Sequence, residues 1–219
     1  GKLMTLEEAI AKIKPLDHNA MEIAQKRWDS IAKPLHSLGK LETLLIQIAG
    51  ITGNAEVDLS RRGLIAMCAD NGVVEEGVTQ TGQEVTAIVA ENFLKYDTSV
   101  GVMCKQNHAE IFPVDMGMVT DTKVRTDHKI AYGTQNMTKG PAMTREQAIA
   151  AIEVGIDMVR ELNDKGYRIL ATGEMGIGNT TTSSAVASVL LKQPVEEMTG
   201  RGAGLTSEGL VRKINAIKK

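Results

Sequence analysis

The sequence predicts an α/β fold: a mostly parallel sheet with flanking helices, preceded by a small helical module. Two observations lead to this prediction. From about residue 58 onward, short apolar runs alternate with segments of helical periodicity, which is typical of βαβ units with right-handed crossovers. The runs are also apolar on both faces, as expected for strands buried in a parallel sheet. The predicted strands are 63–69, 109–114 and the run that begins at Ile169.

Residues 1–57 are expected to form the helical module, and residues 58–219 the α/β domain. Thr5 and Glu8 have the spacing of a capping box, and Asp17 is placed to cap a second helix. Leucines and isoleucines between residues 38 and 48 recur at helical spacing and predict a third helix. Because this part of the sequence has no strand-like run, we expect it to pack against or cover something else.

In the α/β part, polar residues predict where the helices begin. These residues are Thr81 with Glu84, Asp97 or Thr98, Thr144 with Gln147, and Thr206 or Ser207. The segment 119–140 is long, polar and contains glycine. Since a loop of that length in a compact domain is usually functional or mobile, we expect one of these roles for it.

An acidic residue stands at the end of each predicted strand: Asp70, Asp115 and Glu174. Ligands of open α/β sheets bind outside the carboxyl ends of the strands. We therefore expect the three carboxylates to gather at one edge of the sheet. A single acid could belong to a turn, but three in the same position of the repeat favour a functional site.

Composition excludes several classes of function. The net charge of −2 and the 3% aromatic content give no indication of nucleic-acid or anionic-membrane binding. No apolar run approaches the roughly 18 residues of a membrane-spanning helix, and no signal peptide is visible. Cys68 and Cys104 lack metal-like spacing and fit buried thiols in a reducing compartment. We expect a cytoplasmic protein without a metal site.

The stretch from Tyr167 to Ser183 combines a strand, a glycine-rich turn and a helix start. Glu174 precedes Gly176 and Gly178, and a polar cluster, 179–182, leads into an expected helix, 184–191. A helix start offers unpaired N–H groups and a positive dipole end, so this turn is suited to a phosphate. The alternative is a tight turn with a threonine N-cap.

The motifs of other phosphate sites are missing from the sequence. It contains no nucleotide P-loop, no Gly-x-Gly-x-x-Gly and no serine nucleophile elbow. A phosphate turn beside carboxylates suits glycosyl-type chemistry on a sugar phosphate, in which a carboxylate stabilises positive charge at C1′ or takes a proton from an attacking nitrogen.

Several longer motifs together resemble one family, the nicotinate-nucleotide:dimethylbenzimidazole phosphoribosyltransferases, which build the lower-ligand nucleotide of cobamides. They run through the whole chain in the family's order. The matching stretches are Lys33–Glu42, Ala69–Gly77, Gln83–Thr86, Val114–Gly117, Gly133–Asn136, Gly140–Thr144, Gly173–Thr181 and Gly200–Leu205.

This resemblance implies transfer of phosphoribose from nicotinate mononucleotide to 5,6-dimethylbenzimidazole or a related base, giving α-ribazole 5′-phosphate and nicotinate. It also implies a Rossmann-like α/β domain, a homodimer and no metal or other cofactor. Glu174 corresponds to one of two active-site glutamates. The residues that the resemblance assigns to the phosphate and nucleotide are Gly176, Gly178, Asn179, Thr180, Thr181, Gly202 and Lys213. Those assigned to the base are Asp70, Gln80, Gln83 and Ile88.

Glu84 and Lys213 also have plain structural interpretations, and the chain departs from the family first in its residues and then in its length. Glu84 fits a capping box better than base binding, and Lys213 could complement a helix C-terminus. Asn71 stands where the family usually has histidine, and Gln80–Gly82 where it usually has an aromatic residue and a proline. These differences leave the accepted base open between a benzimidazole, a purine and a phenol.

The second departure is length. The chain resembles about the first two-thirds of a family member, so we expect an α/β domain that is incomplete at its C-terminus. The segment that carries the family's second glutamate, its general base, is not among the matching stretches. Two alternatives therefore stay open: a non-catalytic nucleotide- or base-binding subunit that needs a partner chain, and a different phosphosugar enzyme on the same framework.

Overall fold

The computed structural model of the chain describes residues 3–219, so the first two residues of the predicted helical module lie outside the described residues. The described residues up to Arg61 form one compact unit, and Arg62–Lys219 form a second. The division falls between residues 61 and 62, whereas composition suggests 57 and 58. Each unit is described separately below.

The N-terminal unit consists of three helices, α1 (Leu6–Ala11), α2 (His18–Ser30) and α3 (Lys40–Thr52). Both N-caps are present, since the Thr5 side chain accepts a hydrogen bond from the backbone of Glu8 and the Asp17 side chain from that of Ala20. For the predicted capping box at Thr5 and Glu8, this is the first of its two bonds. The loop between α2 and α3 is held by Lys33, whose Nζ lies 2.9 Å from Oε1 of the buried Glu42. This ion pair fixes the loop although few apolar side chains are buried there.

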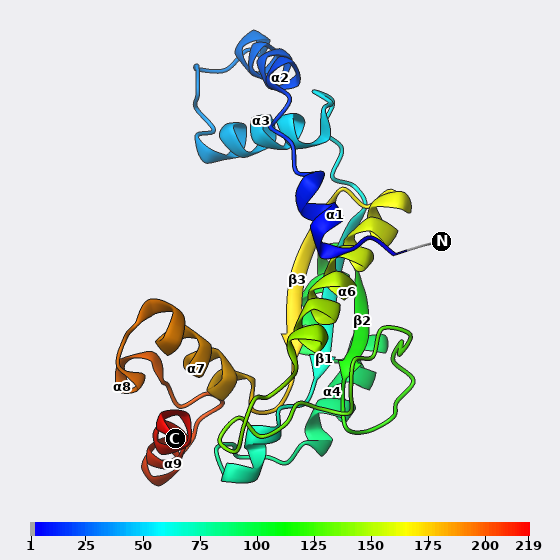
Figure 1. Ribbon diagram of the computed structural model, residues 1–219. Coiled ribbons are helices and arrows are strands. Elements are labelled where there is room, and N and C mark those ends of the chain that lie inside the picture. The colour runs from blue at the N-terminus through cyan, green and yellow to red at the C-terminus, as the bar shows by residue number, and fades with distance from the viewer. Residues whose placement is uncertain (1–2) are drawn as a thin grey trace. The chain divides into compact units, whose positions relative to one another are not determined.

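The second unit contains a parallel three-stranded sheet in the order β2-β1-β3 (Figure 1). Its elements are β1 (Arg62–Ala69), the 3-10 helix η1 (Gly72–Glu76), α4 (Glu84–Leu94), α5 (Ser99–Gln106), β2 (Ala109–Gly117), α6 (Arg145–Asp164), β3 (Ile169–Met175), α7 (Asn179–Leu191), α8 (Val195–Met198) and α9 (Ser207–Lys218). The predicted α/β class is thereby confirmed. Among the described residues, β3 pairs with β1 alone, which leaves its other edge open.

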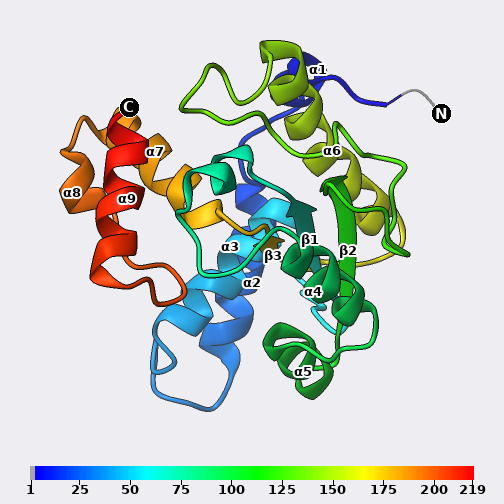
Figure 2. The same ribbon diagram turned by 90° about the horizontal axis from the view of Figure 1, so that it is seen from below.

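Helices cover both faces of the sheet, with α4 and α5 on one side and α6 on the other (Figures 1 and 2). Alternate residues of β1 explain this arrangement. Ala66 and Cys68 pack in a cluster with Phe93 of α4, whereas Ile65 packs in a cluster with Met158 of α6. The strand is therefore apolar on both faces, as its sequence predicts. Cys68 is a free thiol in this core, and burial raises its pKa to about 12.

Most of the predicted helix starts are confirmed, and two are wrong. Thr98 and Thr206 cap α5 and α9, and Thr144 with Gln147 forms the capping box of α6. The box expected at Thr81 does not form, because α4 begins at Glu84 without a side-chain cap.

The helix after the glycine turn begins at Asn179 rather than at residue 184. Its N-cap position is held by Gly178 and not by a threonine. The φ of Gly178 is +90°, a conformation that threonine rarely adopts, and this excludes the alternative of a threonine cap. The polar cluster therefore forms the first turn of α7.

Ion pairs of Lys129 and Arg125 help to hold the long segment between β2 and α6 in place. Nζ of Lys129 lies 3.1 Å from Oδ2 of the buried Asp115, and Arg125 bonds to both Asp127 and Glu161. Oδ1 of Asp115 accepts hydrogen bonds from the backbone of Gly117 and Met118. Asp115 thus anchors this segment. The three strand-end carboxylates lie at one edge of the sheet, as predicted, since Asp115 and Glu174 stand beside Cys68 and Met67 at the end of β1 and Asp70 follows that strand.

Replacing Lys129 by methionine is expected to lower the free energy of unfolding by about 3–5 kcal/mol, the usual cost of leaving a buried charge without its partner. The side chain of Asp115 is fully buried, and that of Lys129 is 11% exposed. Urea unfolding followed by circular dichroism measures the effect. Lys139→Met is the matched control, because its ion pair with Glu75 is exposed and worth at most about 1 kcal/mol. Equal effects in the two variants would contradict the anchoring role.

Candidate active site

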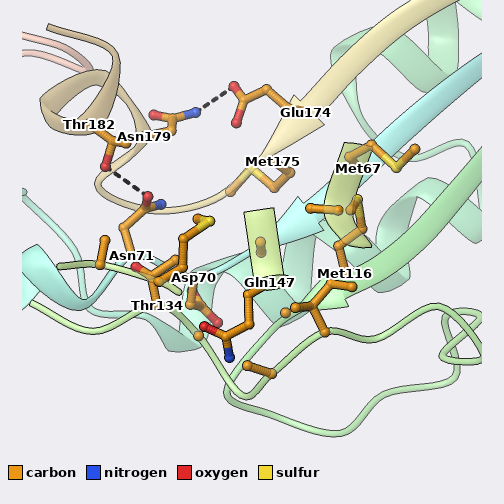
Figure 3. A pocket seen from close by; sticks show the side chains of 18 of the residues that line it. Met67, Asp70, Asn71, Met116, Thr134, Gln147, Glu174, Met175, Asn179 and Thr182 are labelled. Carbon is orange, nitrogen blue, oxygen red and sulfur yellow. Dashed lines mark hydrogen bonds between the residues drawn. The ribbon is translucent and has the colours of Figure 1, made fainter. Parts of the chain in front are cut away.

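A cavity of about 350 Å³ opens at the carboxyl ends of the strands (Figure 3). Its wall is largely apolar, with methionines from each of the three strands and from the segment before α6. They are Met67, Met116, Met143 and Met175. Methionine is flexible and polarisable, so such a wall adapts to a flat apolar ligand. The polar groups in the wall are few, as in most small-molecule sites. They include Asp70, Asn71, Thr134, Gln147, Glu174 and Asn179.

Asp70 supplies a buried acceptor to this cavity. It is 1% exposed, and its Oδ2 accepts a hydrogen bond from the backbone of Val119 at 2.8 Å. Its Oδ1 has no hydrogen-bond partner among the described residues. Leaving a buried acceptor unsatisfied costs about 1–3 kcal/mol, so this oxygen is suited to receive a donor from a ligand.

Glu174 lies in the cavity wall near the end of β3 and is exposed to solvent. Its Oε1 accepts a hydrogen bond of 2.6 Å from Nδ2 of Asn179, in the first turn of α7 (Figure 3). This bond orients the carboxylate while its second oxygen stays available. A carboxylate held in this way can stabilise positive charge or take up a proton.

A second cavity, of about 160 Å³, lies beside the start of α7. Its distinctive residue is Lys213 of α9, which is 1% exposed. Nζ of Lys213 donates to Oγ1 of Thr180 at 2.9 Å and to the carbonyl of Gly200 at 2.8 Å. It forms no ion pair with any described carboxylate, and burial lowers its pKa. A buried ammonium group without a counter-ion beside a helix N-terminus makes an anion site.

Three glycines allow the backbone to form this second cavity. A Cβ on Gly176 would lie 2.1 Å from the carbonyl oxygen of Ala69, so only glycine lets the turn approach the end of β1. Gly178 has a φ of +90°, and Gly202 a φ of +58°. A Cβ on Gly202 would lie 2.9 Å from Oγ1 of Thr180 and would intrude on the contact with Lys213.

The two cavities share Asn179 in their walls. An elongated ligand could therefore place an anionic group beside Lys213 and a flat apolar group among the methionines. The hydrogen bond from Asn179 to Glu174 places the carboxylate next to this junction. The arrangement suits chemistry at the atom that joins the two parts of such a ligand.

The structure brings together most of the residues that the sequence singles out. Asp70, Glu174 and Asn179 line the larger cavity. The smaller one is lined by Gln80, Gly178, Asn179, Thr180, Gly202 and Lys213. Gln80, which the resemblance assigns to the base, thus lies on the anion side. Thr181 is fully buried, and its Oγ1 has no hydrogen-bond partner among the described residues.

Two of the residues assigned to the base lie apart from both cavity walls. Gln83 donates to the backbone carbonyl of Asn71, and Ile88 is 56% exposed on α4. The assignment of these two residues to the base stays a prediction.

Sequence reasoning overlooked several residues of the site. Asn71, Thr134, Gln147 and Thr182 line the larger cavity, and Arg201 lines the smaller one. Asn71 was visible as a departure from the family's pattern. Thr134, Thr182 and Arg201 lie in the matching stretches or in the polar cluster, but no separate role was assigned to them from the sequence. Among residues 3–219, no cluster of His, Cys, Asp and Glu has the arrangement of a metal site. In the same range, no helix combines the length and apolarity needed to cross a membrane.

Known proteins share both the sequence and the fold that build this site. A family model described as "Phosphoribosyltransferase" matches residues 13–219. The chain is 52% identical over 217 residues to the nicotinate-nucleotide–dimethylbenzimidazole phosphoribosyltransferase of Ruminiclostridium cellulolyticum, covering 98% of this chain and 62% of the relative. It is 46% identical to the enzyme of the same name from Clostridium tetani, covering 98% of this chain and 60% of that relative.

The chain is also similar to a solved structure of a protein with this fold. The crystal structure of CobT from Thermus thermophilus superposes with a TM-score of 0.81 at 35% identity, over 91% of this chain and 61% of that one. The chain thus spans roughly 60% of the length of the relatives that it matches. With its fold, its motifs and the family model in agreement, the chain belongs to the nicotinate-nucleotide–dimethylbenzimidazole phosphoribosyltransferase family.

Proposed function

We propose that the protein transfers phosphoribose from nicotinate mononucleotide to 5,6-dimethylbenzimidazole or a related base, giving α-ribazole 5′-phosphate and nicotinate. The observation that carries the proposal is the junction of the two cavities at Asn179 and Glu174. An anion site and an apolar, methionine-lined cavity meet where the C1′ of a bound ribose phosphate would have to react. Both lie in the unit from Arg62 to Lys219, which we propose as the transferase domain.

In this proposal the smaller cavity holds the 5′-phosphate. Lys213 donates the third proton of its ammonium group to a phosphate oxygen, since its other two are already engaged. The first-turn residues Asn179, Thr180 and Thr181, with Gly176, Gly178 and Gly202, supply the helix N-terminus and the close backbone approach. The phosphate therefore fixes the ribose at the rim of the larger cavity.

The larger cavity holds the base in this proposal. Oδ1 of Asp70 accepts an N–H or O–H of the base, and the methionines contact its flat faces. During the reaction the bond from C1′ to the nicotinate nitrogen breaks, and its electron pair returns to the nicotinate ring. A base nitrogen then bonds to C1′, and the N–H proton of the base is released to solvent water. The carboxylate of Glu174 stabilises the positive charge that develops at C1′.

We further propose that the working protein is a cytoplasmic homodimer. The resemblance of the motifs to the family supports the dimer, and the two unpaired, buried thiols suit a reducing compartment.

The proposal is tested by incubating the purified chain with nicotinate mononucleotide and dimethylbenzimidazole and measuring α-ribazole phosphate by mass spectrometry. Formation of the product supports the transferase. Mononucleotide binding without product would favour a binding subunit that needs a partner chain. Absence of both binding and product would refute the proposal.

Replacing Glu174 by glutamine is expected to lower turnover by about 10²- to 10⁴-fold, the range for a positioned acid–base or charge-stabilising group. Mononucleotide binding should change little, because the amide oxygen of glutamine still accepts the bond from Asn179. The rate of product formation and calorimetric titration separate the two effects. Glu110→Gln is the matched control, since this exposed glutamate lies at the opposite end of the sheet. Full activity in the Glu174 variant would remove it from the mechanism.

A further inference from the structure

Asn71, two residues after β1, joins three segments that are distant in the sequence. Its side-chain Nδ2 donates to the carbonyl of Ile177 at 3.1 Å, and its Oδ1 accepts from the hydroxyl of Thr182 at 2.9 Å (Figure 3 shows the second bond). Its own backbone carbonyl accepts from Nε2 of Gln83 at 3.2 Å. One residue thus connects the end of β1 with the glycine turn, with α7 and with the start of α4.

The chemistry of these partners fixes the orientation of the Asn71 amide. The carbonyl of Ile177 can only accept a hydrogen bond, so the NH₂ group must face it. The hydroxyl of Thr182 then donates to Oδ1. A carboxylate in the same place would offer no donor to Ile177, and an alanine would serve neither partner. The two contacts therefore require a side chain that both donates and accepts, as the amide of asparagine does.

The glycine turn packs closely against Asn71 at two positions. A Cβ on Gly176 would lie 3.1 Å from Nδ2 of Asn71, and a Cβ on Gly178 3.2 Å from its Cβ. The backbone N–H of Ile177 donates to Oγ1 of Thr86, a fully buried residue of α4. Both polar groups of Ile177, N–H and carbonyl, are therefore held by side chains from other segments.

We propose that Asn71 is a positioning residue for the phosphate-binding turn. It acts through Ile177 and Thr182, and it sets the distance between the anion cavity and the apolar cavity, so that a phosphate held at α7 places C1′ beside Glu174. This inference rests on the proposed function. It predicts that loss of the amide affects ligands with a phosphate more than a base that occupies the larger cavity alone.

Calorimetric titration of Asn71→Asp with nicotinate mononucleotide, and separately with dimethylbenzimidazole, tests the inference. We expect the mononucleotide affinity to fall by about 10-fold or more, because the donor to Ile177 is lost and a negative charge is placed beside the turn. The base affinity should fall clearly less than the mononucleotide affinity, since Asn71 is one polar group in a largely apolar wall and the apolar contacts remain. Asn163→Asp is the matched control and should bind both ligands as the unaltered chain does, because Asn163 is exposed near the opposite end of β3.

A second pair of variants guards against misfolding of the first. Thr182→Ala removes only the hydroxyl donor, and we expect a smaller loss of mononucleotide affinity, about 3- to 5-fold, that is not additive with Asn71→Ala. Unchanged mononucleotide binding in Asn71→Asp would overturn the inference. Parallel losses for both ligands, together with a lowered melting temperature, would also overturn it, because they indicate a merely structural residue.

The outcomes also separate this inference from the proposed function. If the unaltered chain binds inorganic phosphate but not the mononucleotide, the proposed function fails, and the same variants are compared with phosphate as the probe. A loss of phosphate affinity in Asn71→Asp then supports the positioning role, and equal affinities refute it. If the unaltered chain binds neither probe, both proposals fail.

Discussion

Replacing Lys213 by methionine is expected to weaken binding of nicotinate mononucleotide by about 10- to 150-fold, the range for losing one hydrogen bond to a charged group. The ammonium group is buried, uses two of its protons on Thr180 and Gly200, and faces no described carboxylate. A phosphate oxygen would supply the missing counter-charge. Calorimetric titration measures the loss, and Lys105→Met, an exposed substitution on α5, is the control.

The same substitution should not destabilise the protein at neutral pH. Burial lowers the pKa of Lys213, so between that lowered pKa and the ordinary value the unfolded chain binds more protons than the folded one. The contribution of this group to stability therefore rises as pH rises through that window. Below this pH window Lys213 is charged in the folded protein, and the full cost of desolvating the charge lowers the stability of the fold. Lys213→Met should consequently be at least as stable as the unaltered chain at pH 7, with the difference narrowing at alkaline pH.

Thermal unfolding across this pH range checks the sign. If Lys213→Met is more stable and no longer binds the mononucleotide, the ammonium group of Lys213 serves ligand binding rather than folding. Lower stability at pH 7 in Lys213→Met, with mononucleotide affinity unchanged, would show instead that Lys213 serves packing.

Local patterns predicted the sheet and most helix starts because the physics behind them is local. The apolar run of β1 and the Thr144–Gln147 capping box depend on residues a few positions apart. The prediction of where α7 begins was wrong, and the reason is also physical. Thr180 and Thr181 have low helix propensity and suggest a loop. The φ of Gly178, where the helix begins, depends instead on the close approach of η1 and Asn71.

The candidate site was only partly predictable, because its contacts join residues that are far apart in the sequence. Local spacing indicated Glu174 and the glycine turn. Lys213 lies 33 residues beyond its partner Thr180, and only the family resemblance connected the two. The wall formed by Thr134 and Gln147 depends on how the segment after β2 is fastened to Asp115. No periodic pattern in the sequence predicts this contact between Asp115 and the segment.

Replacing Gly176 by alanine is expected to lower the free energy of unfolding by about 1–3 kcal/mol or more, because the added methyl group overpacks a rigid contact. Its Cβ would lie 2.1 Å from the carbonyl oxygen of Ala69, a backbone atom at the end of β1 that cannot rotate away. The turn must therefore move off the strand. Because that turn carries the start of α7, the binding of nicotinate mononucleotide should be lost together with the stability.

The matched control, Gly173, lies three residues earlier, within β3. A Cβ on Gly173 would meet its nearest neighbour, Cδ2 of Leu64, at 3.5 Å, an ordinary van der Waals distance. Gly173→Ala should therefore keep both its stability and its mononucleotide affinity, as measured by urea unfolding and calorimetry. If Gly176→Ala instead matched Gly173→Ala in both measurements, the turn would have to be free to shift without consequence. In that case the close approach to β1 would not be what shapes the anion site, and the roles given to Gly176 and Asn71 would fail together.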